Sequence, residues 1–174
     1  VAADEIPEFS YVIHPSEQGE NEKIYELEAD SEECEALARR FDLIGIEYFQ
    51  PRLCFQRLRG DATYRLRGRI HARVTQQCVV TLEPIVSDID AQFEIFFHED
   101  FQGDRVEMAV DREIEPLDGD LLDLGEIAAE ELVMALDPYP RRLDIAPTEF
   151  TLETDPELRP THPFAALAAI KGKK

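Results

Sequence analysis

The sequence predicts an α+β fold: an antiparallel sheet or partly closed barrel of six to seven strands, with two main helices and a short C-terminal helix. The strands are indicated by alternating apolar and polar residues, which are clearest between Thr63 and Phe97. The helices are indicated by apolar residues that recur every three or four positions near residues 31–41 and 124–136. These periods of about 2 and 3.6 residues distinguish a strand with one buried face from a helix with one buried stripe.

Two central strands organise the sheet. From Tyr64 to Val74 every second residue is apolar or small, and arginine or histidine fills the positions between them. After Pro84 the alternation resumes, with apolar residues from Ile89 to Phe97 and mostly acidic residues between them. We expect these strands to pair antiparallel, with one face buried and the other exposed to solvent.

The chain before these strands supplies shorter ones. Pro51 is expected to break its strand or to place it at the edge of the sheet, because proline lacks the N–H that a central strand donates. Gly60 and Asp61 predict a turn, so residues 53–74 are expected to form a hairpin. The predicted strands are Phe9–Ile13, Lys23–Ala29, Leu43–Phe49 and Leu53–Arg59.

Capping patterns mark the two helices. Asp30 stands three residues before Glu33, a spacing in which each side chain can bind the other residue's backbone N–H, so a helix is expected over 31–41. Asp123 and Glu126 repeat that spacing before a helix over 124–136, which Pro138 ends.

The C-terminal part of the chain lacks the strand and helix patterns of the rest over residues 138–160. Residues 1–137 are expected to form a single α+β domain, 138–160 a proline-rich linker, and 161–174 a short helix with a basic tail. That helix is too short to be stable alone, so it must dock on its own domain or on a partner. A further strand around Val106–Val110 is expected within the acidic stretch 98–119.

Composition limits the class of protein. The 174 residues carry a formal net charge of −20, which keeps a protein soluble and repels other polyanions at long range. No apolar run approaches the length of a membrane span, and no secretory signal is recognised, so a soluble cytoplasmic protein is expected. Cys34, Cys54 and Cys78 are widely spaced and form no Cys-x-x-Cys pair, which argues against a disulfide framework and a structural zinc site. No cofactor is expected. Cys78 is expected to be buried at a strand end.

Basic residues are concentrated in the middle of the chain. Several guanidinium groups on one strand could follow an RNA backbone. Acids on the neighbouring strand could instead neutralise them, and this interpretation needs no ligand. Arg52, Arg57 and Arg59 have no partner that the sequence suggests, which keeps RNA binding open. The RNA-binding candidates are Arg52, Arg57, Arg59, Arg65, Arg67, Arg69 and Arg73.

The acidic stretch that follows could bind a basic protein, or could simply be a solvated loop that opposes aggregation. Its protein-partner candidates are Asp100, Asp104, Glu107, Asp111, Glu113 and Glu115. No phosphate-binding loop, nucleophile motif or metalloprotease helix is present, so an enzyme, for example a hydrolase or nuclease, is the less favoured class.

Several segments in order resemble one bacterial family. They are Gly68 in the central strand, the run from Val74 to Pro84, Leu122-Asp-Leu-Gly-Glu126, the helix that ends before Pro138, and Pro163-Phe-Ala-Ala-Leu167. Over roughly residues 40 to 170 the chain resembles the YceD-like family, the large ribosomal RNA subunit accumulation proteins.

The resemblance implies a non-enzymatic cytoplasmic factor that supports the synthesis, processing or stability of 23S ribosomal RNA. Its implied partner is the large-subunit ribosomal RNA or its precursor, or a basic large-subunit ribosomal protein. Many members carry a Cys-x-x-Cys pair at the position of Cys78, whereas here Thr81 stands three residues on. A four-ligand thiolate site cannot be built from these residues, so no metal is expected.

Overall fold

The computed structural model describes residues 7–59, 62–99, 114–117 and 119–142. These residues form two helices and seven strands, and the strands make two sheets, which confirms an α+β fold. The helices are α1 (Ser31–Arg40) and α2 (Leu124–Ala135), and a 3-10 turn η1 spans Pro15–Glu17. The strands are β1 (Val12–Ile13), β2 (Lys23–Glu26), β3 (Gly45–Arg57), β4 (Thr63–Gln77), β5 (Pro84–His98), β6 (Ile114–Pro116) and β7 (Leu122–Asp123).

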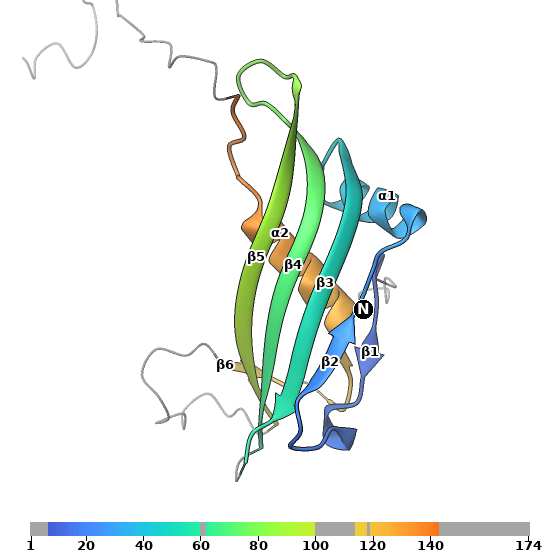
Figure 1. The fold of residues 1–174 in the computed structure, drawn as a ribbon, viewed down its shortest axis with the longest axis vertical. Helices are drawn as coiled ribbons and strands as arrows, with labels where there is room; N and C mark the ends of the chain where they lie inside the picture. The colour runs from blue at the N-terminus through green and yellow to red at the C-terminus, as the bar shows by residue number, and fades with distance from the viewer. Residues whose placement is uncertain (1–6, 60–61, 100–113, 118, 143–174) are drawn as a thin grey trace, which may run out of the picture. The chain divides into compact units, whose positions relative to one another are not determined.

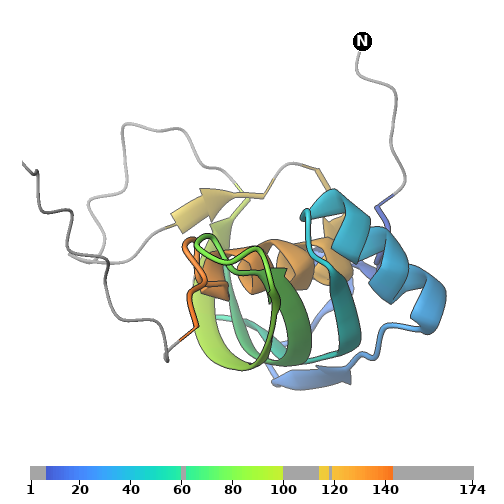
Figure 2. The same cartoon turned by 90° about the horizontal axis from the view of Figure 1, so that it is seen from above.

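The larger sheet has the order β2-β3-β4-β5-β6, and the smaller one pairs β1 with β7. All neighbours in the larger sheet are antiparallel except β5 and β6, which are parallel. The three long strands β3, β4 and β5 lie side by side (Figure 1). Seen from above, the sheet curves around α2 without closing into a barrel (Figure 2).

The core lies on the concave side of this sheet. Most inward residues of β3 and β4 are fully buried and meet the buried face of α2, where Leu124, Ala128 and Leu132 are also fully buried. Figure 1 shows α2 crossing behind the three long strands. The predicted inward face of β4 is confirmed, with Leu66, Ile70, Ala72 and Val74 fully buried.

β3 corrects one prediction. The expected strands Leu43–Phe49 and Leu53–Arg59 are one continuous strand that runs through Pro51, which is opposite Ile70 of β4. The carbonyl of Pro51 accepts from the backbone N–H of Leu27, so the backbone of Pro51 faces away from β4. The missing N–H therefore removes a bond on the β2 side only, where β2 ends at Glu26, and the ladder to β4 continues.

Both helix starts are confirmed, with one difference. The Asp30 and Glu33 capping box of α1 is complete, with hydrogen bonds of 2.9 and 2.8 Å. At α2, Asp123 accepts from the backbone N–H groups of Gly125 and Glu126. The Glu126 side chain does not reach back to Asp123, because it instead pairs with Arg40 of α1.

Asp123 also joins the N-terminal segment to α2. It accepts hydrogen bonds from the Ser10 hydroxyl at 2.5 Å and the Tyr11 backbone N–H at 2.8 Å. The expected first strand Phe9–Ile13 is shorter in the structure, where Val12 and Ile13 pair with β7.

Residues 138–142, the first part of the predicted linker, contact the turn between β4 and β5. The Val79 N–H donates to the Pro140 carbonyl at 3.0 Å, and Arg142 pairs with Glu83 at 2.6 Å. The rest of the predicted linker, the C-terminal helix, the strand at Val106–Val110 and the turn at Gly60 and Asp61 lie outside the described residues.

Candidate functional site

The arginine row lies on the convex, solvent-exposed face of the sheet. Along β4 the residues that alternate with the core point outward, as predicted. They are Arg65, Arg67, Arg69, His71 and Arg73, each partly or largely exposed. This face therefore presents a line of positive groups along the middle of the sheet.

Acids of β5 neutralise part of this row. Arg69 binds both carboxylate oxygens of Asp90, at 2.9 and 2.6 Å. Arg73 lies 3.2 Å from Asp88, and Arg65 lies 4.0 Å from Glu94. The guanidinium of Arg69, through its hydrogen bond, holds the pKa of Asp90 below its usual range. Cross-strand neutralisation, one of the two interpretations of the row, is therefore present.

Acids from the N-terminal block neutralise the other arginines. Arg67 pairs with Glu22, Arg52 lies 3.4 Å from Glu26, and Arg59 lies 3.0 Å from Glu20. The expectation that Arg52 and Arg59 lack partners is wrong. The reason is topological, since β2 and the loop before it lie beside β3 and bring the acids of residues 20–26 to the exposed face.

Arg57 does not belong to this surface. It shares the face of β3 that carries the buried Phe55, and it pairs in register with the buried Tyr64. Its guanidinium lies over the Tyr64 ring, 5.8 Å from the centroid. The seven candidate arginines thus do not form one continuous surface.

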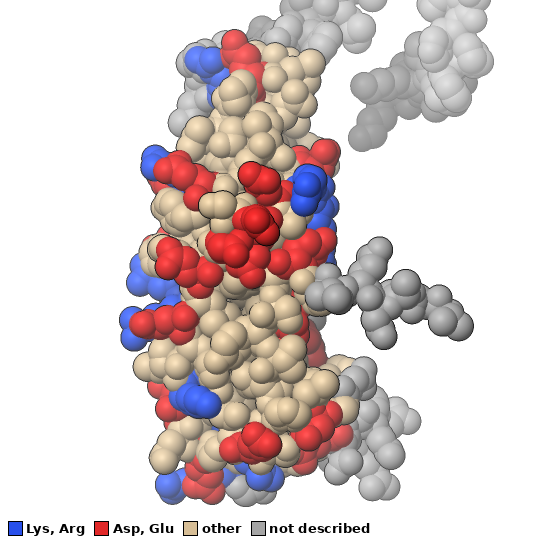
Figure 3. Space-filling view, turned by 90° about the vertical axis from the view of Figure 1, so that its right-hand side faces the viewer, with Lys and Arg blue, Asp and Glu red and all other residues tan. Residues whose placement is uncertain are grey.

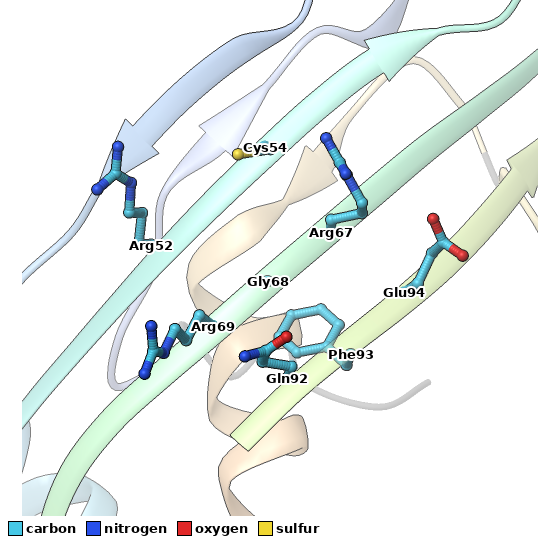
Figure 4. A pocket seen from close by; sticks show the side chains of 8 residues that line it. All are labelled: Arg52, Cys54, Arg67, Gly68, Arg69, Gln92, Phe93 and Glu94. Carbon is cyan, nitrogen blue, oxygen red and sulfur yellow. The ribbon is translucent and has the colours of Figure 1, made fainter. Parts of the chain in front are cut away.

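A shallow hollow of about 550 Å³ opens on the exposed face where Cys54 presents a short side chain between longer ones. Arg52, Arg67 and Arg69 surround it from β3 and β4, and Glu94 lies across from them on β5 (Figure 4). The arginine side chains here are 47 to 60% exposed. Exposed ion pairs of this kind contribute only about 0 to 1 kcal/mol each, so an incoming anion could exchange with the protein's own carboxylates.

Acidic side chains dominate another part of the described surface. On the side of the molecule where β1, β2 and α1 lie, acidic groups gather across the middle and basic groups lie mostly toward the margins (Figure 3). Of the predicted protein-partner set, Glu115 alone is described, exposed on β6 opposite Phe97. The other five candidates, Asp100, Asp104, Glu107, Asp111 and Glu113, lie outside the described residues.

Cys78 is buried just after β4, as predicted. Hydrogen bonding from Thr81, including its backbone N–H at 3.4 Å from Sγ, lowers the pKa of the Cys78 thiol to about 7. Within the described ranges no three His, Cys, Asp or Glu side chains gather as a metal site would need. None of the described helices is long and apolar enough to cross a membrane.

Sequence reasoning missed the acids that complete the charged face. In the sequence, Glu20, Glu22 and Glu26 are only part of an acidic block. No spacing pattern relates them to arginines that lie more than twenty residues away along the chain. It also missed the contact of Arg40 with Glu8 and Glu126, which raises the pKa of Arg40, chiefly through the hydrogen bond to Glu126.

A family model described as large ribosomal RNA subunit accumulation protein YceD matches residues 66–171. The matched region begins in β4 and includes β5 and α2, whereas α1 and β1 to β3 precede it. No curated protein matches the chain, and no solved structure does so.

Proposed function

The chain belongs to the YceD family, whose description links it to accumulation of the large ribosomal RNA, and from this premise we propose that it is a non-enzymatic cytoplasmic factor that holds a basic large-subunit ribosomal protein. The 23S RNA would then accumulate because this partner reaches it in a bound, usable form. Holding a basic polypeptide requires a surface with excess negative charge.

The observation that carries this proposal is the pairing of the exposed arginines. Each outward arginine of β4, together with Arg52 and Arg59, already lies within ion-pair distance of a carboxylate of the same chain. The positive groups are therefore largely balanced, while the chain as a whole carries −20. Such a molecule attracts cations and repels a polyphosphate at long range.

Direct binding of precursor RNA is the second candidate, and the hollow beside Arg52, Arg67 and Arg69 supports it. Its ion pairs are exposed and weak, so phosphates could replace the carboxylates of Glu22, Glu26 and Asp90. Long-range repulsion of RNA by the rest of the molecule opposes this exchange. We therefore place the basic protein first.

Recovery of the tagged full chain from cells at low salt, with and without ribonuclease, tests the choice. We expect a basic ribosomal protein to remain bound after ribonuclease and to be released as salt is raised. Reversing Asp100, Asp104 and Glu107 to lysine should remove it. Reversing Glu32 and Glu35, both exposed on α1, is the control: it reverses two acids instead of three, at another place in the chain, and should leave the partner bound.

A different set of results would identify RNA as the ligand. If ribonuclease releases everything, and Arg67→Glu with Arg69→Glu abolishes retention, then RNA is the ligand and the protein-holding proposal is wrong. The salt dependence of RNA binding would then have a slope of about 0.7 per phosphate contacted on a single strand. Exchanging Arg69 and Asp90 with each other keeps the net charge and the ion pair, and so controls for folding.

A further inference from the structure

The outer edge of β5 is a long strand edge that the described residues leave open. β6 pairs with β5 only at Phe96–His98, so Pro84–Ile95 has a described strand neighbour on one side only, β4. Figure 1 shows β5 as the outermost long strand, with the short β6 at one end of it. The opposite edge of the sheet is formed by the four-residue strand β2.

The hydrogen-bonding groups on this open edge can be assigned. At the two ends of the β4 and β5 ladder, Glu99 N–H donates to the Ala62 carbonyl and Cys78 N–H donates to the Glu83 carbonyl. The register between them is continuous, so the odd-numbered residues of β5 bond to β4. The even-numbered ones face outward, consistent with the Leu117 N–H that donates to the His98 carbonyl. The outward N–H and C=O groups therefore belong to Val86, Asp88, Asp90, Gln92 and Glu94.

Open strand edges usually carry features that block further pairing, such as charged side chains, a central proline, a bulge or an inward charge. The charged side chains of β5 are acidic, so they oppose an acidic strand but not a basic one. β5 has no Lys or Arg, its one proline is its first residue, Pro84, and its pairing with β4 contains no bulge. Its inward positions are apolar or small. The edge is thus geometrically fit to accept another strand.

Side chains beside the edge define which strand would fit. On the exposed face β5 presents Asp88, Asp90 and Glu94, whose side chains are 65, 49 and 44% exposed. Each also pairs with an arginine of β4, so a basic side chain of an added strand would share the carboxylate with that arginine. On the core side Ile89 and Phe93 pack against the core but remain only partly buried. An added strand would set its own side chains alternately beside these carboxylates and beside these apolar groups.

We propose that the edge of β5 receives an extended segment of a basic protein by strand addition, with lysine or arginine alternating with apolar residues. The choice of a basic partner rests on the proposed function. A second copy of this edge fits poorly, because it would place carboxylates beside carboxylates. The chain's own residues 143–158 contain five acids and no Lys or Arg, so they are repelled for the same reason.

The positions of the carboxylates predict a spacing. Asp88 and Asp90 are two residues apart and Asp90 and Glu94 are four apart, about 7 and 13 Å along a strand. An antiparallel partner therefore places basic residues opposite Glu94, Asp90 and Asp88, at its first, fifth and seventh positions. The capped peptide Lys-Val-Gln-Val-Lys-Val-Lys has this pattern.

The test is a titration of the isotope-labelled full chain with that peptide, followed by amide hydrogen exchange. In the free chain we expect the outward amides of Asp88, Asp90, Gln92 and Glu94 to exchange rapidly, and in the complex to slow by at least tenfold. A peptide of the same composition with its lysines grouped at one end, and one with N-methyl groups on the amides that face β5, should not slow them.

Gln92→Pro supplies the matched variant, because it removes an outward N–H without removing a bond to β4, whereas Gln92→Ala keeps that N–H. Binding should be lost in the first and kept in the second. Outward amides that are already protected in the free chain, or equal binding by both variants, would overturn the proposal. A cellular basic partner that is retained equally by Gln92→Pro would overturn it too and leave the proposed function standing. If the peptide binds but no basic cellular partner is recovered, the strand-addition proposal stands and the proposed function is overturned.

Discussion

Replacing Gly68 with alanine tests how β4 and β5 pack together. Gly68 is opposite Phe93 in the register, and the Phe93 ring lies against the bare backbone of Gly68 on the core side. A Cβ at position 68 would lie 2.1 and 2.2 Å from two ring atoms and 2.9 Å from a methyl group of Leu53. None of these contacts can be tolerated, so the ring must move.

The cost follows from that displacement. Overpacking a core by one methyl group typically costs about 1 to 3 kcal/mol. Alanine also stabilises the folded state by roughly 0.5 to 1 kcal/mol relative to glycine, because it loses less backbone entropy on folding into a strand. Phe93 is only partly buried, so its ring can swing outward, which keeps the cost well below that of a fully trapped ring. The overpacking cost less the entropy gain leaves an expected fall in the free energy of unfolding of about 1 kcal/mol.

Thermal and urea denaturation measure this change. For a chain of this size, about 1 kcal/mol corresponds to a Tm lower by roughly 2 to 4 °C. Gly45→Ala is the matched control, since a Cβ there meets nothing within 4 Å, and it should leave Tm unchanged or slightly raised. Adding Phe93→Ala should remove most of the penalty of Gly68→Ala, and the double-mutant cycle should show coupling of about 1 to 2 kcal/mol.

A Gly68→Ala protein as stable as the Gly45→Ala protein would refute the reasoning. So would two additive substitutions at positions 68 and 93, because the penalty would then have a source other than the ring.

Three further predictions concern stability. Asp123→Ala should lower the free energy of unfolding by about 1 to 2 kcal/mol in urea denaturation, because it removes the cap of α2 and its bonds to the N-terminal segment; no change would contradict the capping role. Burial and the hydrogen bond to Glu99 raise the pKa of Tyr64 from 10.0 to about 12, so this stabilisation is complete below pH 10 and lost between pH 10 and 12. Tyr64→Phe should reduce the fall of Tm between pH 10 and 12. If Tm falls as steeply in the variant as in the unaltered protein, other titrating groups cause the fall. Arg40→Gln should lower the free energy of unfolding, measured by urea denaturation, by about 1 kcal/mol at low salt and by less at high salt. At both salt concentrations the loss should exceed that of Arg39→Gln.

Local patterns predicted the parts of this protein that depend on neighbours in sequence. The faces of β4 and β5 follow from an alternation that extends over many residues, since a one-residue slip would expose every buried side chain. The Asp30 cap follows from a spacing of three residues. The continuity of β3 through Pro51 could not be read in this way, because proline is tolerated or excluded according to which side of the strand lacks a neighbour.

What the amino-acid order determined by itself is therefore the fold class, the buried faces of β4 and β5 and the concentration of arginine in β4. Tertiary structure alone decided that residues 20–26 would reach those arginines and that Arg57 would lie over Tyr64. It alone also left most of β5, from Pro84 to Ile95, with one described strand neighbour, β4. The physical reason is that periodicity fixes the direction of a side chain, whereas the order of strands fixes its neighbours, and both ion pairing and edge exposure depend on neighbours.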